Sequence, residues 1–119
     1  MLKTVICEIG AFVPSFKEEK VLILFGPNAP KELKEISVIH KFKEVDSEQS
    51  LIKGGKMIWG NREYSITAVG SQANRNFYEL GHISIYFREL DQEVLPGAIF
   101  VKPYIFPEIE IGKEICFET

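Results

Sequence analysis

Residues 62–87, REYSITAVGSQANRNFYELGHISIYF, decide the fold of this 119-residue chain. Apolar and polar side chains alternate over residues 63–69, and they alternate again over residues 82–87. A period of two is typical of a strand with one face buried and the other exposed to water. The segment therefore predicts two strands of one sheet, with a break between them.

The residues between these strands predict a short helix with a sharp turn at each end. Gly70 ends the first strand, and Ser71 is placed to cap the helix by accepting a hydrogen bond from a free backbone N–H. The spacing i, i+4, i+7 gives the helix one apolar stripe, formed by Ala73, Phe77 and Leu80. Gly81 then stands where a helix end favours a positive φ angle.

Short strand-like segments recur along the rest of the chain and are separated by Gly and Pro. They cover residues 4–9, 21–25, 36–42, 56–59, 98–102 and 114–118. This pattern predicts one domain over residues 1–119, a closed or nearly closed antiparallel β-barrel of about eight short strands with one or two short helices. Such domains protect their sheet edges by closure or by pairing with a second copy, so a homodimer is one of two expected arrangements.

The composition excludes several classes of protein. The net charge of −3 and the sequence pI of about 5.4 argue against binding to nucleic acid. No apolar run approaches the roughly 20 residues of a membrane span, and no signal peptide is recognised, so we expect a cytoplasmic protein that does not insert into the membrane. The chain has no zinc-ligand spacing and no Walker A or Rossmann glycine pattern, so we expect neither a metal nor a nucleotide cofactor.

The chain has two histidines, His40 and His82. His40 interrupts an otherwise apolar row on one strand face, formed by Ile36, Val38 and Phe42. One interpretation is a histidine at the edge of the core, satisfied by a backbone carbonyl. The other is a reactive imidazole in a shallow apolar depression that helps to hold one tautomer. The periodicity leaves both interpretations open.

Three strings of the second half carry a family resemblance: ITAVGS (66–71), ELGHISI (79–85) and LPGAIFV (95–101). In their order and spacing they resemble the glucitol/sorbitol-specific IIA component of the bacterial phosphotransferase system. The resemblance runs from about Ile6 to the C-terminus. It implies a phosphotransferase component that accepts a phosphoryl group on a histidine from a small histidine phosphocarrier protein. The group then passes to the IIB part of the IIB/IIC membrane sugar permease, which phosphorylates the hexitol on entry.

The resemblance also suggests which residues do this work. The family's phosphorylated histidine follows an isoleucine, and the position that matches is His40 after Ile39. A second histidine can follow two residues later in relatives, but here that position is Phe42. His82 is then the candidate for orienting or stabilising the transfer. Because the donor is itself a phosphohistidine, the resemblance implies no metal and no nucleotide.

The start of the predicted helix is a candidate phosphate site. Backbone N–H groups at a helix N-terminus attract anions, so Gly70 and Ser71 are predicted to help hold the phosphoryl oxygens. A plain turn from strand to helix explains the same two residues equally well. If they do hold phosphate, Gly70→Val should slow transfer more than it lowers stability. The alternative function is a non-catalytic β-barrel binding module with structural histidines.

Overall fold

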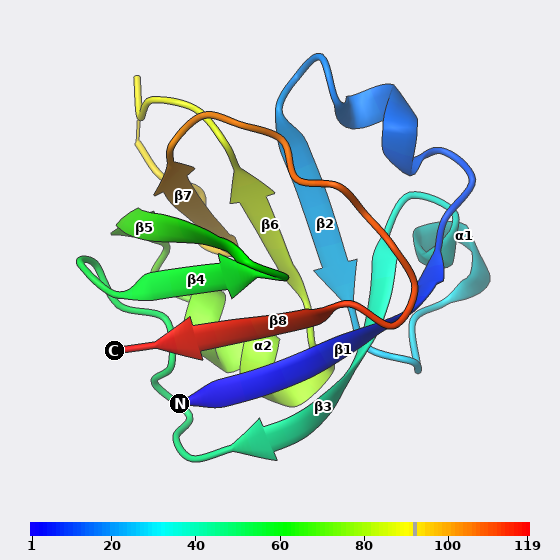
Figure 1. The fold of residues 1–119 in the computed structure, drawn as a ribbon, viewed down its shortest axis with the longest axis horizontal. Coiled ribbons are helices and arrows are strands. Elements are labelled where there is room, and N and C mark those ends of the chain that lie inside the picture. Colours follow the sequence, from blue (N-terminus) through cyan, green and yellow to red (C-terminus); the bar gives the residue numbers. More distant parts are fainter. Residues whose placement is uncertain (92) are drawn as a thin grey trace.

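Eight strands close into a barrel in the computed structural model of the chain, which describes residues 1–91 and 93–119 (Figure 1). The order around the barrel is β1-β3-β2-β6-β7-β5-β4-β8, and β8 pairs back onto β1. The strands are β1 (Leu2–Ile9), β2 (Val21–Phe25), β3 (Val38–Val45), β4 (Lys56–Trp59), β5 (Arg62–Val69), β6 (Ile83–Tyr86), β7 (Ala98–Lys102) and β8 (Glu114–Glu118). Closure removes the free sheet edges that would favour pairing with a second copy.

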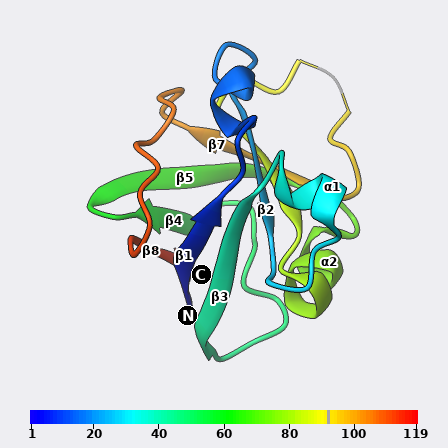
Figure 2. The ribbon, with the colours of Figure 1, turned by 90° about the vertical axis from the view of Figure 1, so that its right-hand side faces the viewer.

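The predicted fold class is confirmed. Neighbouring strands are antiparallel except for two parallel pairs, β2–β3 and β6–β7. Two short helices, α1 (Lys31–Lys34) and α2 (Ala73–Leu80), lie on one side of the barrel (Figure 2), and a single 3-10 turn covers Val13–Phe16. Among residues 1–91 and 93–119, no helix is both long and apolar enough to cross a membrane.

The strands of residues 62–87 form as predicted. The inward side chains are almost completely buried: Tyr64, Ile66 and Ala68 on β5, and Ile83 and Ile85 on β6 with Phe87 just after it. The two strands are not neighbours, because β7 lies between them and pairs with both. The crossover through α2 therefore leaves room for a strand from the C-terminal half of the chain.

The helix between them differs from the prediction at both ends. Its N-cap residue is Gln72 rather than Ser71, and no side chain caps the helix. Residues 70–72 instead form a turn in which the Gln72 N–H donates to the Pro96 carbonyl oxygen, so a neighbouring loop replaces the predicted cap. At the other end Leu80 is 51% exposed, and only Ala73 and Phe77 of the predicted stripe are buried.

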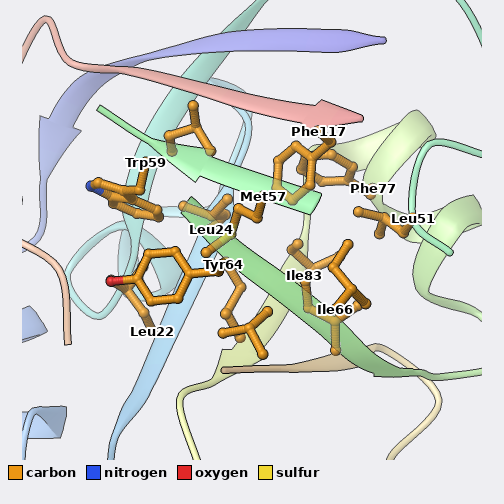
Figure 3. Close-up of a cluster of buried hydrophobic side chains, with 14 of the residues drawn as sticks. Leu22, Leu24, Leu51, Met57, Trp59, Tyr64, Ile66, Phe77, Ile83 and Phe117 are labelled. Atoms are coloured by element: carbon orange, nitrogen blue, oxygen red, sulfur yellow. The ribbon is translucent and has the colours of Figure 1, made fainter. Parts of the chain in front are cut away.

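One continuous hydrophobic core fills the barrel (Figure 3). At one edge of the drawn cluster, Phe77 of α2 packs against Phe117 of β8, with their ring centroids 5.1 Å apart. At the opposite edge, the polar ends of Trp59 and Tyr64 donate hydrogen bonds to carbonyl oxygens of the segment that precedes β8. The helix and this segment thus close the core from different sides, and the α2 side is the one that meets His40.

Candidate functional site

His40 lies on β3 and is only 1% exposed. Its neighbours Val38 and Ile39 are also buried, so the strand does not show the simple alternation that the sequence predicts. Ile39 points to the other face of the strand, where it forms a small second cluster with Phe25 and Ala29. Both faces of β3 are therefore covered at this point, and His40 is more deeply buried than a shallow depression would make it.

Both ring nitrogens of His40 have hydrogen-bond partners. Nε2 lies 2.7 Å from the carbonyl oxygen of Gly81, and Nδ1 lies 2.6 Å from the hydroxyl oxygen of Thr4. A carbonyl oxygen can only accept a hydrogen bond, so the proton of the neutral ring lies on Nε2. Nδ1 then accepts a hydrogen bond from the Thr4 hydroxyl. The surroundings thus select one tautomer of His40.

Aromatic rings enclose the rest of the His40 imidazole. Phe77 of α2 stacks on it at a centroid distance of 5.6 Å, and Phe42 meets it edge-on at 5.2 Å. Burial among these rings lowers the pKa of His40 from its ordinary value of 6.5, and the hydrogen bond to Gly81 partly opposes this shift. The ring is consequently neutral at pH 7, which is the form with a nucleophilic lone pair.

The lowered pKa predicts how stability depends on pH. Below about pH 6.5 the unfolded chain binds a proton at His40 before the folded protein does, so the free energy of unfolding should fall as the pH falls. The contribution of one such group is at most about 1.4 kcal/mol per pH unit. Chemical denaturation at several pH values should show a shallower loss for His40→Gln than for the parent protein. Equal losses in the two proteins would contradict the lowered pKa.

A cavity of about 190 Å³ opens beside the His40 ring. It lies between the segment leading to α1 and the C-terminal end of α2. Its lining residues are Phe25, Gly26, Pro27, Asn28, His40, Phe42, Tyr78, Glu79, Leu80 and Gly81. Thr4, the partner of Nδ1, is fully buried and does not line this cavity. Nε2 is therefore the nitrogen on the cavity side of the ring, and Nδ1 faces the barrel interior.

His82 is close to this site along the chain but has a different environment. Its Nδ1 lies 3.2 Å from the Leu24 carbonyl oxygen, and its ring stacks on Phe25 at a centroid distance of 4.4 Å. Phe25 lines the cavity, whereas His82 does not. His40 contacts Gly81, the residue that precedes His82, so the two histidines lie on segments that are far apart in the sequence but meet in the fold. The predicted orienting or stabilising role of His82 stays a prediction.

Gly70 and Ser71 lie at the opposite end of α2 from Gly81 and His40. The Gly70 N–H already donates to the Ala98 carbonyl oxygen. Ser71 is exposed and lines a separate cavity of about 550 Å³, whose described lining residues include Glu93 and no basic side chain. Their position does not favour the predicted contact with phosphoryl oxygens at His40, which stays a prediction.

The expected outcome of Gly70→Val is corrected by the surroundings of Gly70. A Cβ atom at this position would collide with the backbone carbonyl oxygens of Leu95 and Pro96. A side chain here collides with backbone, so Gly70→Val should lower stability severely instead of mainly slowing transfer.

Ser71→Ala is the cleaner test of this end of the helix. Ser71 is exposed, and no hydrogen bond caps the helix through its side chain, so the variant should keep the stability of the parent protein. We expect its rate of phosphate uptake to stay within about twofold of the parent protein, because the hydroxyl is remote from the His40 cavity. Intact-mass measurements over time would show this. A loss of uptake in a fully folded Ser71→Ala protein would instead support the predicted phosphate site.

Thr4 is the site residue that sequence reasoning missed. Its side chain is part of the inward row of β1, between Leu2 and Ile6, and it is fully buried. A hydroxyl in a row of aliphatic side chains is the signal that was available, because a buried polar group needs a partner. The sequence could not identify that partner, which is 36 positions away.

No metal site is present in the part of the chain that the structure describes. No group of three or more His, Cys, Asp or Glu side chains is gathered closely enough there to hold an ion. The chemistry available at the site is that of a neutral, buried imidazole next to a small cavity.

Comparison with known proteins assigns this chain to a family. The sequence model of the PTS system glucitol/sorbitol-specific IIA component matches residues 1–116. This chain belongs to that family. Two relatives named PTS system glucitol/sorbitol-specific EIIA component, from Shigella flexneri and Escherichia coli (strain K12), are each 33% identical over 117 residues. Each alignment covers 98% of this chain and 94% of the relative.

A solved structure of a PTS system IIA component has the same fold. The crystal structure of a PTS system IIA component from Enterococcus faecalis V583 superposes with a TM-score of 0.90 at 31% identity. The match covers 98% of this chain and 99% of the other. The glucitol/sorbitol IIA resemblance predicted from three short strings is thus confirmed over nearly the whole length, and a phosphotransferase role follows from it.

Proposed function

We propose that this chain is the phosphocarrier subunit of a hexitol phosphotransferase system and that His40 carries the phosphoryl group. A small histidine phosphocarrier protein is the donor, and the IIB part of the sugar permease is the acceptor. The placement of the His40 ring supports this function most directly. Its Nε2 side borders a cavity at the molecular surface, while its other side is fixed inside the barrel.

The cavity is suited to a transient protein partner. Tyr78 and Leu80, at its rim, are 45% and 51% exposed, which offers apolar surface next to the reactive ring. Docking there excludes water, and transfer between two imidazoles then depends mainly on positioning and on stabilisation of the anionic phosphoryl group. None of the described residues that line the cavity is Lys or Arg, so the balancing positive charge comes from the docked partner or from backbone N–H groups.

Phosphate transfer with purified components tests the function. The protein is incubated with phosphoenolpyruvate and the general phosphotransferase proteins, and its intact mass is followed. We expect a gain of one phosphate that is stable in base and labile in acid. Adding the IIB part of a hexitol permease should remove it. Failure to gain phosphate, with a known IIA protein labelled in the same mixture, would contradict the proposal.

One observation supports a second candidate function. Both nitrogens of His40 are hydrogen-bonded within the protein, as in a purely structural histidine. A non-catalytic binding module would show this arrangement and would take up no phosphate under any of these conditions.

A further inference from the structure

We propose that Thr4 is a positioning residue for phosphoryl transfer: its hydroxyl holds Nδ1 of His40 in both tautomers and thereby allows Nε2 to act as the nucleophile. This inference rests on the proposed function of His40. It concerns a residue on β1 that neither borders the cavity nor is exposed to water.

The tautomer present in the structure is not the reactive one. Nε2, on the cavity side, carries the proton and donates it to the Gly81 carbonyl oxygen. The free lone pair is on Nδ1, which faces the barrel interior and is covered by the Thr4 hydroxyl. A phosphoryl donor that enters the cavity therefore meets an N–H group and not a lone pair. Reaction requires the other tautomer, in which the ring has released the Nε2 proton to water in the cavity and has bound a proton from solvent at Nδ1, so the number of protons on the ring is unchanged.

A hydroxyl is the partner that suits both states. It donates to a bare Nδ1, and after rotation about its C–O bond its oxygen accepts from an Nδ1–H group. Without that partner the reactive tautomer would bury an unsatisfied N–H in an apolar core, which is costly. The Thr4 oxygen lies 2.6 Å from Nδ1, so no movement of the strand is needed for the change of role.

The other partner of the ring must give way. In the reactive tautomer the Nε2 lone pair would face the lone pairs of the Gly81 carbonyl oxygen at 2.7 Å, which is repulsive. Gly81 is the C-cap of α2 with φ 68°. The peptide group that carries its carbonyl is held by a hydrogen bond from the His82 N–H to the Asn76 carbonyl oxygen, so that bond must loosen before the carbonyl can turn away. Movement of this carbonyl uncovers Nε2 toward the cavity, where the donor arrives.

The transfer step then balances. The Nε2 lone pair forms a bond to phosphorus while the bond between phosphorus and the donor imidazole nitrogen breaks, and that electron pair returns to the donor ring. The phosphoryl group is the only group that changes molecules. The proton on Nδ1 stays in its hydrogen bond to the Thr4 oxygen, and the positive charge that develops on the His40 ring is held there.

Two substitutions at Thr4 separate positioning from packing. Thr4→Val keeps the shape and removes the hydroxyl, whereas Thr4→Ser keeps the hydroxyl and removes a methyl group. With excess phosphorylated donor, Thr4→Val should take up phosphate about 10- to 100-fold more slowly than the parent protein, and Thr4→Ser should recover most of the rate. A Val variant as fast as the parent, or a Ser variant as slow as Val, would overturn the proposal.

Nitrogen-15 NMR of the histidine rings gives a second readout that needs no variant. In the resting protein the His40 spectrum should show protonated Nε2 and bare Nδ1. After phosphorylation, coupling to phosphorus should appear at Nε2, with a proton on Nδ1. Phosphorus coupled to Nδ1, or a resting ring protonated at Nδ1, would overturn the role given to Thr4. If the parent protein took up no phosphate at all, the proposed function would fail instead, and the two failures are thus distinct.

Discussion

His40→Gln should take up no detectable phosphate, a loss on the order of 10³-fold or more, because the substitution removes the nucleophile itself. The glutamine amide retains donor and acceptor groups within reach of the Gly81 carbonyl and the Thr4 hydroxyl, which are the two partners of the native ring. Most of the barrel core does not involve His40, so the variant should still fold. Circular dichroism and intact mass on the same sample would measure fold and phosphate uptake together.

His82→Gln is the matched control. It removes the second imidazole, which stacks on Phe25 and bonds the Leu24 carbonyl but does not line the cavity. This protein should still be phosphorylated, either more slowly or with a defect limited to onward transfer to the IIB part. Normal uptake by His40→Gln together with none by His82→Gln would reverse the assignment.

Local sequence pattern was sufficient to predict most of the strands. The alternation on β5 and β6, and the positive φ angle at Gly81, depend on interactions between near neighbours in the chain. The alternation failed on β3, where Ile39 and His40 are both buried, because Phe25 at the end of β2 and Ala29 after it cover the outer face. The predicted cap at the N-terminal end of α2 was wrong for a similar reason. The Pro96 carbonyl oxygen accepts a hydrogen bond there, from the Gln72 N–H, and Ser71 does not cap the helix.

The site was predicted only in part because its contacts are long-range. His40 was identified through the family resemblance, but its two hydrogen-bond partners lie 36 and 41 positions away. The register of the antiparallel β1–β3 pair sets which residue of β1 lies beside His40, and the crossover through α2 sets where the Gly81 carbonyl points. Neither follows from the periodicity of a single segment. Gly70 and Ser71 lie just before α2, whereas the opposite end of the helix meets His40, and their predicted contact with the phosphoryl oxygens stays a prediction.

Gly81 ends helix α2 and also contacts His40, so a single methyl group at this position should lower both stability and phosphate uptake. Its φ angle of 68° is unfavourable for alanine by about 1–2 kcal/mol. A Cβ atom would also lie 2.8 Å from the Gly26 nitrogen and 3.0 Å from Nε2 of His40. Such overpacking typically costs about 1–3 kcal/mol more. Gly81→Ala should therefore lose roughly 2–5 kcal/mol of unfolding free energy.

Gly112→Ala separates the backbone strain from the collision. Gly112 also has a positive φ angle, 92°, but a Cβ atom there would meet nothing within 4 Å. We expect Gly112→Ala to lose only about 1–2 kcal/mol of unfolding free energy, which is the backbone strain alone. It should take up phosphate at the parent rate. Gly81→Ala should be less stable and, under conditions where it is folded, about tenfold or more slower, because its methyl group lies where Nε2 must meet the donor. Denaturant titrations would measure the stability of both variants, and initial rates of mass gain would measure their phosphate uptake. Equal stability and equal rates in the two variants would show that the contact between Gly81 and His40 is not important for transfer.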